Sequence, residues 1–109
     1  MIETLEKTAD IKSTIGDALF TKTQQRLLAL LFGQVDRSFY LNELVRLAAV
    51  GKGSVTRELT KLASADLLTI SKQGNQNHYK ANANSPVFSE IKQIVLKSFG
   101  LVDLIKTSL

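Results

Sequence analysis

The feature that most constrains the fold of this 109-residue chain is a pair of short helices joined by a glycine-containing turn. Residues 41–48 and residues 52–65 each place leucine, valine or alanine along one helical face, with polar side chains elsewhere. Between them we expect Gly51 to adopt the left-handed conformation that closes a helix. Two amphipathic helices this short and this close together are typical of a helix-turn-helix motif.

The segment after the second helix alternates apolar and polar residues, which is typical of strands. Residues 68–71 and 77–81 show this pattern, and the polar loop 73–76 between them contains a glycine. We therefore predict a β-hairpin, with residues 38–40 as a third strand that pairs with it. Within the hairpin we expect Tyr79 to be a packing residue.

A strongly apolar helix is predicted before these elements. Thr21 is a good N-cap residue and Gln24 follows three residues later, which is the pattern of a capping box. Residues 23–32 are apolar on most sides, so we expect this helix at the centre of the core, ending at Gly33.

Both ends of the chain are predicted to add further helices. We expect Ser85 to cap a helix that has Pro86 in its first turn. Gly100 separates this helix from a last short one at 101–109. At the other end, residues 1–17 are expected to form an N-terminal extension with a short, frayed helix.

Together these elements predict a mainly α-helical protein with a small β-hairpin, in the α+β class. Their order is that of a winged helix-turn-helix: a three-helix core, a two-stranded wing and C-terminal helices. The length allows one domain with one core. We assign the winged helix-turn-helix to residues 18–85 and the C-terminal helices to residues 86–109.

Positive charge is concentrated in the middle of the chain. Residues 21–82 contain nine basic and four acidic side chains, an excess of five, whereas residues 1–20 carry a net negative charge. A basic central segment favours a polyanionic partner such as DNA, although many small basic domains bind no anion. The candidate DNA-binding residues are Lys52, Gly53, Ser54, Thr56, Arg57 and Lys61 on the second helix of the pair, Arg46 on the first, Lys22 and Arg26 on the preceding helix, and Lys72, Gln73, Asn75 and Gln76 on the wing.

We expect the second helix of the pair to enter the major groove of DNA. One of its faces is apolar and packs, so the opposite face can lie in a groove about 12 Å wide. Arg57 is expected to contact DNA, and Gly53 would let the backbone approach a phosphate closely. The alternatives are that Arg57 and Lys61 are solvated surface charges and that Gly53 is a local irregularity. The wing tip, 73–77, has no charge and adds nothing to counterion release.

Other classes of site lack the residues they need. The chain contains no cysteine and one histidine, His78, which excludes a disulfide framework, a thiolate zinc site and a histidine-rich metal site. No glycine-rich phosphate loop follows a strand and the carboxylates are scattered, so we predict neither a cofactor nor enzymatic activity. The longest apolar run, 27–32, is far shorter than the roughly 20 residues of a membrane-spanning helix. We expect a cytoplasmic protein with no membrane partner.

Residues 44–68 resemble the helix-turn-helix core of ArsR- and MarR-like bacterial transcriptional regulators. The matching residues are Val55, Arg57, Leu59, Leu62 and the Leu67-Leu68 pair that leads into the wing. A wider resemblance, over about residues 18–106, is to the winged-helix module that often precedes a minimal nucleotidyltransferase domain. It is carried by the segments 18–23, 30–33, 36–40, 75–79, 81–82, 85–86 and 97–101.

The chain departs from these families at three points. Asp66 occupies the position before the Leu-Leu pair where such modules usually have glycine, so the turn into the wing is expected to differ. The Gly-Ser motif and paired aspartates of a nucleotidyltransferase do not follow before Leu109, which leaves a stand-alone regulator or a trimmed chain. The cysteine or histidine clusters of metal-sensing regulators are missing, so the resemblance implies no thiolate metal sensing and no effector.

Regulators of this kind commonly dimerise through terminal helices, so the resemblance implies a homodimer. The C-terminal segment supports this interpretation because its apolar residues are numerous for one small core. The alternative is that they only complete the core of one chain. The candidate dimerisation residues are Phe88, Ile91, Ile94, Val95, Phe99, Leu101, Leu104 and Ile105.

The sequence thus predicts a transcriptional regulator that binds double-stranded DNA in a sequence-specific manner. Residues 52–64 would lie in the major groove, and the wing at 72–78 would lie beside it. The alternative is a non-catalytic accessory or protein-interaction module that serves a nucleotidyltransferase in the same chain or in a partner. A third class is a winged helix that binds RNA or only proteins.

Overall fold

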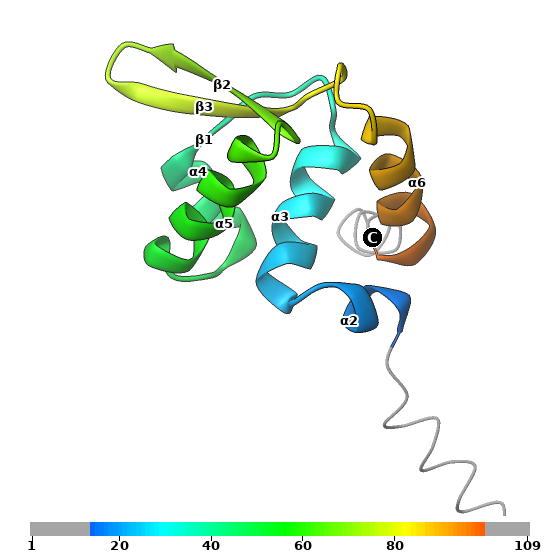
Figure 1. Cartoon of the computed structure of the whole chain (residues 1–109). Coiled ribbons are helices and arrows are strands. Elements are labelled where there is room, and N and C mark those ends of the chain that lie inside the picture. The colour runs from blue at the N-terminus through cyan, green and yellow to red at the C-terminus, as the bar shows by residue number, and fades with distance from the viewer. Residues whose placement is uncertain (1–13, 100–109) are drawn as a thin grey trace, which may run out of the picture.

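Helix α3 (Lys22–Gly33) lies at the centre of the computed structural model, which describes residues 14–99 (Figure 1). Helices α4 (Leu41–Ala48) and α5 (Lys52–Ser64) pack on one side of α3, and α6 (Phe88–Ser98) packs on the other. The two predicted helices of the helix-turn-helix are therefore confirmed. The structure is mainly helical, as predicted.

A three-stranded antiparallel sheet lies over these helices, with strand order β1-β3-β2. The strands are β1 (Phe39–Tyr40), β2 (Leu68–Gln73) and β3 (Gln76–Ala81). The hairpin and its third strand are thus confirmed, but the loop is shorter than the predicted 73–76. Gln73 pairs with Gln76, so Gly74 and Asn75 alone form the turn. Gly74 has a φ of 63°, as the first central residue of a type II′ turn requires.

Helix α3 begins with the predicted capping box. The Thr21 hydroxyl accepts from the N–H of Gln24 at 3.2 Å, and the Gln24 side-chain oxygen accepts from the N–H of Thr21 at 2.9 Å. Leu27 and Leu31 on this helix have no exposed surface, and the helix ends at Gly33. Helix α3 is thus capped at its N-terminus as predicted, and its apolar side chains are covered by α4, α5 and α6.

The turn between α4 and α5 is closed by Ala49 and not by Gly51. Ala49 has a φ of 55°, and its N–H donates to the carbonyl of Val45 at 3.0 Å. Gly51 has a φ of −58° and is the N-cap residue of α5, where its carbonyl accepts from the N–H of Val55 at 3.1 Å. The prediction for Gly51 is wrong because the left-handed residue must directly follow α4, which leaves Gly51 to start the next helix.

Asp66 makes the turn into the wing that a glycine would make. It has a φ of 62°, and its N–H donates to the carbonyl of Ala63 at 3.0 Å. The N–H of Leu67 donates to the carbonyl of Leu62 at 3.0 Å, which completes the hydrogen-bond pattern of a Schellman motif. The expected difference at this turn is therefore not found, because aspartate tolerates the left-handed region better than most residues do.

Helix α6 begins later than the predicted cap at Ser85. Its N-cap residue is Val87. Ser85 and Pro86 instead form a turn in which the N–H of Phe88 donates to the carbonyl of Ser85 at 3.1 Å. Proline needs the same φ at the second position of such a turn as in the first turn of a helix, so the sequence signal does not separate the two structures.

Helix α2 (Ile15–Leu19) contacts both α3 and α6. Gly16 lies so close to α6 that a Cβ atom there would be 2.7 Å from the ring of Phe99. That ring meets Phe20 edge-on, with 5.9 Å between the ring centroids. Residues 1–13 of the predicted N-terminal extension lie outside the described residues.

Ala49→Gly is expected to raise the free energy of unfolding by about 1 kcal/mol, because glycine adopts the left-handed conformation without the steric cost of a Cβ atom. Ala49 is exposed, so little packing is lost. Urea denaturation should show a higher midpoint with an unchanged slope. The matched control is Ala65→Gly at the end of α5, where φ is −90°. There glycine should lower stability by about 0.5–1 kcal/mol. A lower midpoint for Ala49→Gly would contradict this account.

Candidate nucleic-acid interface

Most of the predicted DNA-binding side chains of α5 are exposed, and Arg57 lies on the face that points away from the core. Val55 and Leu59 are buried, so the opposite side of the helix faces solvent. Arg57 lies on that side and forms no ion pair within residues 14–99. The exposed candidates on α5 are Lys52, Gly53, Thr56, Arg57 and Lys61, whereas Ser54 is half-buried.

Gly53 lies in the first turn of α5. A Cβ atom at this position would meet nothing within 4 Å, so packing inside the chain does not require a glycine. The position leaves an accessible stretch of backbone near the start of the helix. A close approach of a phosphate to this backbone stays a prediction.

Glu58 joins α5 to α3. The side-chain nitrogen of Gln24 donates to one oxygen of Glu58 at 3.2 Å, and the ammonium of Lys61 lies 3.8 Å from the other. The Lys61 side chain is still 68% exposed, and exposed pairs of this kind are weak. Glu58 therefore links α5 to α3 through a hydrogen bond, and Lys61 can still meet an outside anion.

Two arginines bind groups inside the chain. Nη1 of Arg26 donates to the carbonyl of Ala48 at 3.2 Å, which places its charge at the C-terminal end of α4. Arg37 pairs with Glu43, and its guanidinium lies 4.3 Å from the ring centroid of Phe39. Arg26, predicted to contact phosphate, thus also holds α4 against α3.

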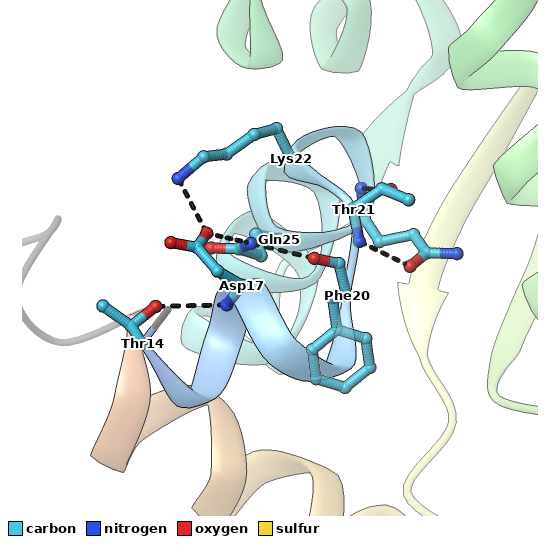
Figure 2. Close-up of polar contacts among 7 residues, drawn as sticks. Thr14, Asp17, Phe20, Thr21, Lys22 and Gln25 are labelled. Carbon is cyan, nitrogen blue, oxygen red and sulfur yellow. Dashed lines mark hydrogen bonds and ion pairs between the residues drawn. The ribbon is translucent and has the colours of Figure 1, made fainter. Parts of the chain in front are cut away.

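Lys22 forms an ion pair with Asp17 of α2, as Figure 2 shows. Its ammonium lies 2.9 Å from the carboxylate of Asp17, and the buried Gln25 donates to the same carboxylate at 3.0 Å. Gln25 also donates to the carbonyl of Phe20 at 3.0 Å. The hydrogen bond from Gln25, together with the charge of Lys22, lowers the pKa of Asp17 to about 2. A phosphate contact by Lys22 would have to compete with this ion pair.

The wing extends past α4 and α5 (Figure 1). The side chains of residues 71–77 are exposed to solvent. The exposed candidates here are Lys72, Gln73, Asn75 and Gln76, and on α4 Arg46 is also exposed. Neither Lys72 nor Arg46 forms an ion pair in the described part of the chain. These two side chains therefore keep their charges available.

A cavity of about 230 Å³ lies between the wing, the start of α4 and the start of α5, and we call it the wing cleft. The polar residues that line the wing cleft are Tyr40, Asn42, Lys52, Asn75, Gln76, Asn77 and Tyr79. Sequence reasoning missed Tyr40, Asn42 and Asn77 as candidates, because no local pattern shows that the start of α4 meets the wing. Of the residues that line the wing cleft, Lys52 could be placed near its neighbours from sequence, because it directly follows the turn between α4 and α5.

The predicted dimerisation residues of α6 pack largely within the chain. Val95 has no exposed surface and Phe99 is 8% exposed, while Phe88 and Ile91 pack against the same core. Ile94 is half-buried. These positions match the alternative that the residues complete the core of one chain. The further candidates Leu101, Leu104 and Ile105 lie outside the described residues.

Among residues 14–99, no group of three or more histidine, aspartate or glutamate side chains could hold a metal ion. Within the same part of the chain, no helix is both long enough and apolar enough to cross a membrane.

The element order, the sheet and the exposed basic face of α5 define this protein as a winged helix-turn-helix domain. Comparison with solved structures supports this class. No family model matches the sequence, and no curated protein matches it.

Three solved structures share the fold. NadR in complex with 4-hydroxyphenylacetate is 23% identical with a TM-score of 0.61, covering 98% of this chain and 76% of NadR. The MarR family transcriptional regulator SPO1453 from Silicibacter pomeroyi DSS-3 is 16% identical with a TM-score of 0.59, covering 97% of this chain and 75% of SPO1453. AntR, an antimony-specific transcriptional repressor, is 21% identical with a TM-score of 0.57, covering 80% of this chain and 72% of AntR.

At these identities the similarity establishes the fold. It confirms, at that level, the predicted resemblance to ArsR- and MarR-like winged-helix regulators. The same structures give no support to the predicted link with a nucleotidyltransferase.

Asp17→Asn is expected to remove part of the acid sensitivity of folding. The pKa of Asp17 is lowered from 3.8 to about 2 in the folded chain. The ionised carboxylate therefore stabilises the fold above about pH 4, and this stabilisation is lost as pH falls towards about 2. Urea midpoints measured across this window should fall more steeply for the wild type than for the variant. The control Asp36→Asn removes an exposed aspartate outside this cluster and should keep the wild-type steepness. Equal steepness in Asp17→Asn and the wild type would contradict the prediction.

Proposed function

We propose that this chain is a transcriptional regulator that binds double-stranded DNA in a sequence-specific manner. The observation that carries the proposal is the pair of exposed cations on α5, Arg57 on the outer face and Lys52 at the start of the helix, neither of which forms an ion pair within residues 14–99. The wing flanks this helix, since Lys52 and the wing residues 75–77 line one cavity. The shared fold of AntR and SPO1453, both described as transcriptional regulators or repressors, supports the proposal.

In the proposed complex, α5 lies in the major groove and the wing lies beside it. Arg57 is at the middle of the outer face, where its planar guanidinium can donate two hydrogen bonds to the O6 and N7 atoms of guanine. Arg46 and Lys72 would meet phosphates on either side of that helix. These contacts position the protein, and Arg57 provides base recognition.

The proposal includes a homodimer in the cytoplasm, with no cofactor and no catalytic step. Ile15 and Leu19, four residues apart on α2, are 64% and 59% exposed. Exposed apolar side chains that gather on one face are typical of an interface. A two-fold dimer would present two α5 helices to half-sites about one helical turn apart. Leu101, Leu104 and Ile105 remain part of the proposed interface.

The test is selection from a randomised duplex DNA library at about 150 mM salt, where non-specific phosphate binding is suppressed. An enriched inverted repeat would support a dimeric regulator, and a single enriched half-site would support a monomeric one. Weak, salt-sensitive binding without an enriched sequence would overturn the proposal. That result would favour the accessory module as the alternative.

Arg57→Ala is expected to weaken binding to the selected duplex by about 1–3 kcal/mol and to relax base preference at one position of each half-site. Fluorescence anisotropy titrations on the selected duplex and its single-base variants measure both effects. Lys92→Ala on α6 is the control, because it removes one positive charge at a helix away from α5. An equal loss of affinity in the two variants would show that Arg57 contributes only general charge.

A further inference from the structure

The wing cleft is lined by a tyrosine whose ring is buried and whose hydroxyl has no hydrogen-bond partner within residues 14–99. Tyr79 on β3 is 7% exposed, and its hydroxyl makes no hydrogen bond within residues 14–99. In that part of the chain, every side-chain polar atom that is fully enclosed does have a partner. The Tyr79 hydroxyl must therefore reach solvent, and the wing cleft is the opening that Tyr79 lines. The ring of Tyr79 packs in the core, and its hydroxyl is left free for a ligand from outside the chain.

The other groups around the wing cleft are suited to an anion. Lys52 is the one charged side chain that lines it, and Lys52 forms no ion pair in the described part of the chain. Amide side chains of Asn42 and Asn75 supply further donors. No carboxylate lines the cleft among residues 14–99. A lysine, a tyrosine hydroxyl and amide groups can all donate to the oxygens of a phosphate.

We propose that the wing cleft binds one phosphodiester group of the DNA backbone, held by the ammonium of Lys52 and the hydroxyl of Tyr79. This rests on the proposed function, because the cleft opens between α5 and the wing, the two elements that would contact DNA. The bound phosphate fixes how far the duplex reaches toward the wing. It thereby sets the register in which Arg57 meets a base pair.

Tyr79→Phe tests the hydroxyl without removing the ring. On the selected duplex it should weaken binding about 10-fold, the usual value of one hydrogen bond to a charged group. Because tyrosine carries no charge, the slope of log K against log salt should stay at the wild-type value. Lys52→Ala should instead reduce that slope by about 1. Lys92→Ala is the control and should change neither quantity.

The thermal midpoint of Tyr79→Phe should equal that of the wild type, since the hydroxyl has no partner inside the chain. A clear loss of stability would assign the hydroxyl to the fold and overturn the proposal. Wild-type affinity in Tyr79→Phe, measured on a duplex that the wild type binds, would also overturn it. If the wild type binds no duplex, the proposed function itself fails. If the wild type binds a duplex and Tyr79→Phe binds it equally well, only the phosphate site fails, so the two failures are distinguishable.

Replacing the phosphates of the duplex one at a time with neutral methylphosphonates identifies the bound group. One position should weaken wild-type binding but have little further effect on Lys52→Ala or Tyr79→Phe. If Lys52→Ala and Tyr79→Phe became insensitive to methylphosphonate replacement at every phosphate of the duplex, a single phosphate site would be contradicted. Titration of the full chain with inorganic phosphate and with a deoxynucleoside monophosphate covers a free ligand. Saturable binding of either that Tyr79→Phe abolishes, with duplex affinity unchanged, would assign the cleft to a small molecule and overturn the DNA contact.

Discussion

The rest of the structure depends on the burial of α3. Leu27 and Leu31 have no exposed surface, and the helix is covered by α4 and α5 on one side and by α6 on the other. A helix that is apolar on most sides must be enclosed in this way. Covering α3 commits Val55 and Leu59 of α5 to the core, and helical geometry then points Arg57 outward. The orientation of the basic face thus follows from the packing of the central helix.

Hydrogen bonds and ion pairs between the helices decide which cations stay free. Arg26 is bonded to the end of α4, Lys22 to Asp17, and Lys61 shares Glu58 with Gln24. Within residues 14–99, Lys52 and Arg57 have no such partner. Some basic residues are therefore held by partners inside the chain, and others, among them Lys52 and Arg57, keep their charges available to an outside anion. Overall charge alone does not separate the two groups.

The elements could be predicted where the signal is local. Helical periodicity located α4 and α5, and the pair Thr21 and Gln24 located the start of α3. The errors arose where one signal fits two structures. Glycine and proline near Gly51 and Ser85 mark a turn without fixing which hydrogen bonds close it. The wing cleft could not be found from sequence, because it joins residues from α4, α5 and β3 that are far apart along the chain.

The number of basic side chains left without a partner limits the affinity that one chain of the proposed regulator could have for DNA. The wing tip between β2 and β3 is uncharged, so it offers directional hydrogen bonds and releases no counterions. Each neutralised phosphate adds about 0.9 to the slope of log K against log salt. Within residues 14–99, the cations of α4, α5 and the wing that form no ion pair are Arg46, Lys52, Arg57, Lys72 and Lys80. Two chains on one inverted repeat double these contacts and turn the second binding event into an intramolecular one. In the proposed homodimer, this gain would let a domain of modest charge hold a specific site at physiological salt. The Tyr79 hydroxyl would add to it a contact that salt does not weaken.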